Sequence, residues 1–237
     1  ALQFFQELIK FHLTTGHKAA LIDADRNRLK FVYDNSILDI KQDLYEKALQ
    51  DLLKKQESDP NSAEVSHQLA EFYFSKSRSF TPVPHWQKKE EAQEKISGKW
   101  NYKKAYEICT EAIKKYPNSI GGSMCKSLQT TIQRKELNVQ VEKVYLPNQP
   151  ILGFMEYRNF TKGNFKLLKL SEKQIREIET WQWDEKISRL NKLPVLHSWE
   201  KTLPDDGDFR KHTIEFPIQA LDAGQYMLMV SDNTNFS

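Results

Sequence analysis

The spacing of apolar residues changes partway along the chain, and this change most constrains the fold. As far as about Arg134, apolar side chains recur every three to four residues, which is typical of helices that bury one face. From Leu137 onward most of them alternate with polar residues, as in half-buried strands, with one helical interruption. The sequence therefore predicts an α+β protein with an all-helical domain, residues 1–136, followed by an antiparallel β domain, residues 137–237.

Length and charge exclude some classes of protein. The chain has 237 residues and a formal net charge of +3, without a basic tract, so nucleic-acid binding is not expected. No apolar run approaches the ~18 residues of a transmembrane segment. Because the chain starts at Ala1 rather than Met, we interpret it as a piece of a longer protein. A membrane anchor ahead of Ala1 is compatible with this interpretation.

Two helical stretches, Tyr45–Ser62 and Tyr102–Ser119, repeat Tyr, Lys, Ala, Pro, Asn and Ser at identical internal spacing. Each is expected to end before its proline, because proline disfavours helix in the residue ahead of it. The Asn-Ser pair after the proline is expected to cap the following helix.

This pattern resembles the tetratricopeptide (TPR) repeat, in which small and large apolar residues alternate on paired helices. The residues that match it are Ala48, Leu52 and Pro60, then Leu69, Ala70 and Tyr73, then Ala105, Cys109 and Pro117. Extra residues between the two copies fall in 75–99, where Thr81-Pro-Val-Pro84 interrupts the helical pattern. The alternative is a helical bundle with chance similarity. A TPR-like stack implies a groove that binds a peptide or protein partner.

Two cysteines lie on successive predicted helices. Cys109 and Cys125 are nearly equidistant from the turn at 117–119, which places them at similar height in an antiparallel hairpin. Two interpretations stay open: a disulfide, or two buried free thiols.

The second half predicts six short strands, at 138–146, 151–158, 164–170, 195–203, 209–218 and 224–230. Ser171 begins a helix to about Asn191 that is broken near Trp183, with Gln174 at capping-box spacing. Six strands of this length predict a β-sandwich that lacks its last strand and carries an inserted helix.

Two motifs then resemble macroglobulin domains. Leu221-Asp-Ala-Gly-Gln-Tyr226 is similar to their L-x-x-G-x-Y pattern, and Met155-Glu-Tyr-Arg-Asn159 to a strand end of the form v-x-Y-R-N. The residues that carry the likeness are Tyr157, Arg158, Asn159, Gly224 and Tyr226. Together with the preceding helices, they resemble the amino-terminal region of bacterial alpha-2-macroglobulin-like proteins.

This resemblance implies an immunoglobulin-like, macroglobulin-type sandwich in a protein of the cell envelope, periplasmic or surface-exposed. It implies a non-enzymatic scaffold for protease inhibition or defence, whose partner is a protease or another envelope protein. The alternative is a TPR-type adaptor. The C-x-E-Q thioester of covalently trapping members is absent at both cysteines.

No catalytic, cofactor or metal residues are predicted. The six histidines are dispersed. Asp205-Asp-Gly-Asp208 offers carboxylates for calcium, but a hairpin turn with positive φ at Gly207 is favoured. Trp181, Trp183 and Trp199 form either a stacking platform or, as favoured, packing for the inserted helix. The chain is not expected to be an enzyme.

Overall fold

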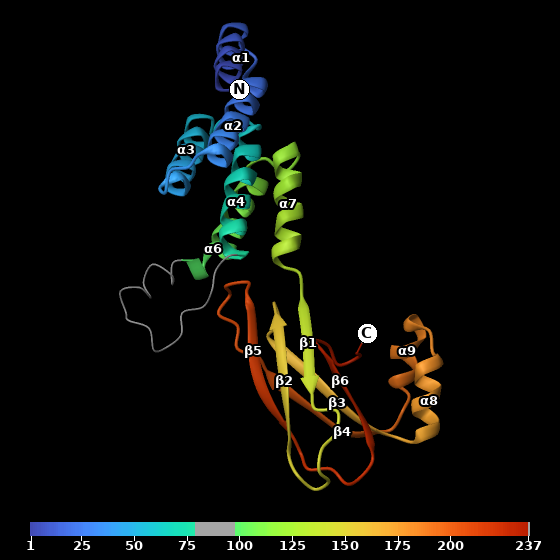
Figure 1. The fold of residues 1–237 in the computed structure, drawn as a ribbon. Helices are drawn as coiled ribbons and strands as arrows, with labels where there is room; N and C mark the ends of the chain where they lie inside the picture. The colour runs from blue at the N-terminus through green and yellow to red at the C-terminus, as the bar shows by residue number, and fades with distance from the viewer. Residues whose placement is uncertain (79–97, 237) are drawn as a thin grey trace. The chain divides into compact units, whose positions relative to one another are not determined.

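The computed structural model describes residues 1–78 and 98–236 and is of the α+β class (Figure 1). The chain divides into two compact units, Ala1–Gln133 and Arg134–Ser237. The boundary predicted from sequence, at 136/137, falls at the start of the first strand. The Thr81–Pro84 segment and most of the predicted 75–99 insertion lie outside the described residues.

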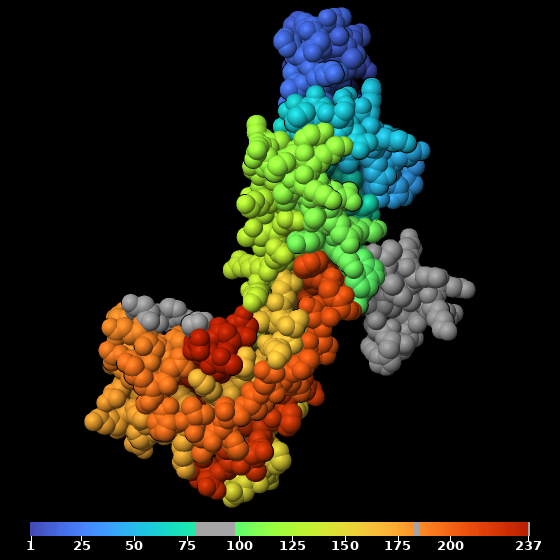
Figure 2. Space-filling view, turned by 180° about the vertical axis from the view of Figure 1, so that it is seen from behind, coloured from blue at the N-terminus to red at the C-terminus, as the bar shows by residue number. Residues whose placement is uncertain are grey.

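The first unit is entirely helical in the residues described. Its helices are α1 (Leu2–Thr15), α2 (Lys18–Asn35), α3 (Lys41–Lys55), α4 (Ser62–Arg78), α6 (Asn101–Lys115) and α7 (Ile120–Ile132). Helix α4 is central, since it contacts α3, α6 and α7 and buries most of its surface. The α1–α2 hairpin, blue in Figure 2, projects from one end of this unit.

Both repeated helices stop ahead of their prolines, but only α6, which ends at Lys115, stops next to its proline, Pro117; α3 already ends at Lys55, five residues before Pro60. The caps of the following helices also differ. Ser119 caps α7, because its hydroxyl accepts a hydrogen bond from the Gly122 amide at 2.9 Å. Ser62, predicted to cap α4, is instead its first residue. The turn ahead of it is held by Asp59, whose carboxylate accepts from the Asn61 amide at 2.9 Å.

The second unit contains two three-stranded antiparallel sheets. The strands are β1 (Glu136–Val141), β2 (Ile151–Arg158), β3 (Lys162–Leu170), β4 (Val195–Thr202), β5 (Lys211–Ile218) and β6 (Gln225–Ser231). One sheet has the order β1-β2-β5 and the other the order β4-β3-β6. The sheets share one core, in which Met155 and Phe216 of the first contact Phe165 of the second.

Two short helices, α8 (Glu172–Thr180) and α9 (Trp183–Leu190), form the predicted insertion. The capping box at Ser171 and Gln174 is confirmed. Ile178 and Leu190 pack on Leu168 and Met229, on the face of β4-β3-β6 that points away from the shared core. The alternation of apolar residues on β3 is therefore interrupted, because both of its faces are covered.

Two predictions for the strands were wrong. The first strand was expected over 138–146, but β1 ends at Val141. The predicted hairpin at 204–208 is not a hairpin, because β4 and β5 belong to different sheets. Gly207 does have the expected positive φ, 71°.

Candidate functional site

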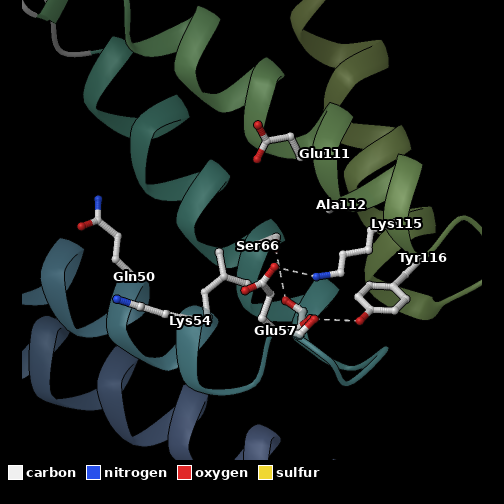
Figure 3. Close-up of a pocket in the computed structure, with 10 residues that line it drawn as sticks. Gln50, Lys54, Glu57, Ser66, Glu111, Ala112, Lys115 and Tyr116 are labelled. Atoms are coloured by element: carbon white, nitrogen blue, oxygen red, sulfur yellow. Dashed lines mark hydrogen bonds and ion pairs between the residues drawn. The ribbon is translucent and has the colours of Figure 1, made fainter.

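A groove of about 310 Å³ opens between α3, α4 and α6 of the helical unit (Figure 3). Its lining residues are Gln50, Leu53, Lys54, Glu57, Ser62, Ser66, Glu111, Ala112, Lys115 and Tyr116. Short side chains, Ser62, Ser66 and Ala112, leave the space between the helices, because longer ones would fill it. Figure 3 shows Gln50 and Lys54 on the α3 side and Glu111 on the α6 side.

Polar contacts close one end of the groove. The Lys115 ammonium lies 2.9 Å from the Glu57 carboxylate, and the Tyr116 hydroxyl donates to the Glu57 carbonyl at 2.7 Å. The hydrogen bond from Lys115 lowers the pKa of Glu57 and correspondingly raises that of Lys115. The pair is exposed to solvent, so it orients the two segments more than it stabilises them.

The open part of the groove carries opposite charges on its two walls. Lys54 and Glu111 are both exposed, and neither has an ionic partner within residues 1–78 and 98–236. Such a surface can pair with a ligand that has both an acidic and a basic group. The TPR-like pattern implied a groove, but no sequence motif pointed to these lining residues, because they come from three helices.

The TPR-like residues lie mainly in helix contacts. Leu52, Leu69, Ala70, Tyr73, Ala105 and Cys109 are buried. Ala48 is partly exposed, and Pro60 and Pro117 are exposed in the turns after α3 and α6. Tyr73 also donates to the Glu46 carboxylate at 2.6 Å, and burial raises its pKa.

The two cysteines are brought together as free thiols. Both are fully buried, Cys109 on α6 and Cys125 on α7. The neighbouring Cys125 thiol and burial raise the pKa of Cys109, and the neighbouring Cys109 thiol lowers the pKa of Cys125. The disulfide stays a prediction.

The Tyr-Arg-Asn motif at the end of β2 anchors three backbone segments. The Tyr157 hydroxyl donates to the Pro204 carbonyl at 2.5 Å, and Arg158 Nε to the Phe209 carbonyl at 2.8 Å. Asn159, at φ 59°, donates from its amide to the Arg134 carbonyl at 2.9 Å. The motif therefore fixes both the start of this unit and the 203–210 connection.

The second motif closes a turn on itself. Tyr226, at the start of β6, donates its hydroxyl to the Asp222 carbonyl at 3.1 Å. Gly224 lies within this turn, where an added Cβ would come 3.3 Å from the Tyr226 ring. Glycine here lets the ring lie across the turn.

The acidic 205–208 segment gains a histidine that sequence spacing did not reveal. Ligand atoms of Asp205, Asp206 and His212 all lie within 4.8 Å of one another, which is compatible with a metal ion. However, His212 Nε2 already lies 3.0 Å from the buried carboxylate of Asp208. The geometry is accounted for by this contact between His212 and Asp208, which holds the connection between the two sheets.

The tryptophans do not gather into a platform in the residues whose side chains are described. Trp199 stacks on Phe165 with ring centroids 5.0 Å apart. Trp181 packs in the separate cluster under α8 and α9, with the Arg189 guanidinium 5.3 Å from its ring centroid. The Trp183 side chain lies outside the described residues.

No family model matches the chain, and no curated protein matches it. Of the helices in 1–78 and 98–236, none combines the length and apolar character needed to cross a bilayer.

Proposed function

We propose that the chain is a non-enzymatic interaction scaffold whose helical groove binds a segment of a partner protein. The observation that carries the proposal is the pair of opposite charges, Lys54 and Glu111, on facing walls above short side chains. Charged walls without ionic partners favour a ligand that supplies its own acidic and basic groups. A TPR-type adaptor, which holds an extended or helical segment between its helices, fits this geometry.

A displayed peptide library, selected against the whole chain, tests this proposal. Selected peptides should carry both an acidic and a basic residue. The double variant Lys54→Glu with Glu111→Lys should bind them at least roughly ten-fold more weakly, since two favourable charge contacts become repulsive. Circular dichroism should show no change in fold, because both side chains are exposed.

A matched control keeps the charge change but moves it off the groove. Lys55→Glu with Glu107→Lys makes the same two charge reversals at exposed positions on the same two helices, and neither residue lines the groove. Peptides that bind the charge-reversed groove and the control equally well would count against the proposal, as would a selection that yields no binder.

A second proposal concerns the family of the whole protein. The strand orders β1-β2-β5 and β4-β3-β6 fit strands A-B-E and C′-C-F of an immunoglobulin-like sandwich. The hydrogen bond from Tyr226 to the Asp222 carbonyl fits the tyrosine corner at the start of strand F. These features support a macroglobulin-type domain, and with it a role in protease inhibition or defence at the cell envelope.

The complete reading frame tests this second proposal. Further sandwich-length repeats are expected after Ser237, beginning with a strand that can pair with the free edge of β6. A frame that ends near Ser237 would contradict the macroglobulin proposal and leave the groove proposal standing.

A further inference from the structure

Helices α6 and α7 form an antiparallel hairpin whose register is fixed by side-chain hydrogen bonds. Gln129 on α7 donates to the Tyr106 carbonyl at 3.2 Å and to the Thr110 hydroxyl at 2.6 Å, both on α6. Cys109 lies one helical turn from Tyr106, toward the connection between α6 and α7. Cys125 lies one helical turn from Gln129, also toward that connection. The register therefore places both cysteines at the same level of the hairpin.

The two thiols are also neighbours in the core. Both are fully buried, and each thiol shifts the pKa of the other, so the two sulfurs lie close together. The Ala63 carbonyl on α4 lies 4.0 Å from Cys125 Sγ. A bond between the sulfurs would join α6 to α7 in the layer where both helices contact α4.

We propose that Cys109 and Cys125 are a modification site, joined by a disulfide as the chain folds under oxidising conditions. This inference does not depend on the groove or on the family of the protein. It is favoured over two permanently reduced thiols because the helix register and the burial of both side chains together place the sulfurs side by side.

The oxidant is a disulfide, either a small molecule or a protein. One cysteine thiolate attacks a sulfur of the oxidant, which forms a mixed disulfide and releases one thiolate. The second cysteine thiolate then attacks the mixed disulfide and releases the other thiolate. The oxidant takes up the two protons and two electrons that the cysteines lose, and it is thereby reduced to two thiols. Because the folded core excludes the oxidant, the first attack takes place before the hairpin is fully buried.

The experiment refolds the whole chain in a series of glutathione redox buffers, with and without denaturant. Remaining thiols are alkylated under denaturing conditions and counted by intact mass. We expect an intramolecular disulfide, two hydrogens lighter than the reduced chain. The ratio [GSH]²/[GSSG] at half-oxidation should be at least about 100-fold higher without denaturant, because folding holds the sulfurs together.

The matched control is Cys125→Ala with Ser127→Cys, which moves one cysteine two residues along α7. Ser127 is exposed, so the loop length hardly changes while the sulfur leaves the core. We expect its half-oxidation ratio to be lower without denaturant than with it, because the folded helices hold its two sulfurs apart. The proposal would be overturned by a wild-type ratio that denaturant does not change, or by glutathione adducts in place of the internal bond. The comparison within the wild type decides the matter even where the variant does not fold.

Discussion

At the scale of single residues, the most informative titratable group is His67, which α4 carries into the helical core. It is 7% exposed, and burial lowers its pKa below 6.5 because the core disfavours the charged imidazolium. Glu71, whose carboxylate lies 3.7 Å away, and Glu64 oppose this shift, whereas Arg26 adds to it. The folded unit therefore favours neutral His67.

Acidification should therefore destabilise the helical unit through His67. As pH falls below 6.5 the unfolded chain takes up a proton that the folded chain resists. The contribution of neutral His67 to the free energy of unfolding is fully present above pH 6.5. Below this pH it is lost, at up to about 1.4 kcal/mol per pH unit, until the pH reaches the pKa of His67 in the folded state. Urea unfolding at pH 7.5 and 5.5 should show a larger loss for wild type than for His67→Gln. The exposed His17→Gln variant should behave as wild type, and equal losses in all three would contradict the prediction.

Local chemistry made several residues predictable. The capping box at Ser171 and the positive φ of Gly207 follow from rules that act within four residues. Asp208 and His212, which contact each other, are also only four residues apart. However, Asp208 lies in a connection and His212 lies in β5. Nothing in the spacing of the histidines indicated this contact, because it depends on how the chain crosses between the sheets.

At the scale of secondary-structure elements, the central feature is the close approach of α7 to α4. A Cβ added at Gly121 would lie 2.2 Å from the Ala63 carbonyl carbon and 2.2 Å from the Glu64 nitrogen. Both are backbone atoms, so the helices would have to separate. Glycine is therefore required here by packing, since α7 begins against the first turn of α4.

Substituting this glycine should destabilise the helical unit alone. Gly121→Ala is expected to cost about 1–3 kcal/mol of unfolding free energy, the usual range for overpacking a core. The gain in helix propensity from alanine, at most ~1 kcal/mol, is too small to offset it. Ser123→Ala, exposed on the same helix, is the control and should change stability little. An unchanged denaturation midpoint for Gly121→Ala would show that α7 does not approach α4 this closely.

The existence of elements was more predictable than their assembly. β2 has the predicted bounds, and the break between α8 and α9 falls two residues from Trp183, near the expected position. The TPR-like pattern implied a groove, but its lining was not predictable, because Lys54, Ser66 and Glu111 come from three helices whose relative positions no local pattern encodes. The assignment of β4 and β5 to different sheets was missed for the same reason.

At the scale of the whole molecule, each unit has a core of its own. Leu49, Val65 and Ile132 are fully buried within the helical unit. In the strand unit the core is shared by both sheets, with Phe165 and Phe216 at its centre, 5.0 Å apart between ring centroids. Since hydrophobic burial is the main favourable term in folding, two separate cores indicate two units that can each fold alone.

Residues 1–133 and 134–237, produced as separate chains, should therefore each unfold cooperatively in urea. The slope of the unfolding free energy against urea concentration increases with the surface that unfolding exposes. The slope of each fragment should therefore be smaller than the slope expected if the whole chain unfolded in a single step. A fragment ending at residue 118 is the matched control, since it lacks α7 and uncovers the faces of α4 and α6 that α7 contacts. It should show no cooperative transition. If residues 134–237 remain unfolded as a separate chain although the whole chain folds, the prediction that the second unit folds alone is contradicted.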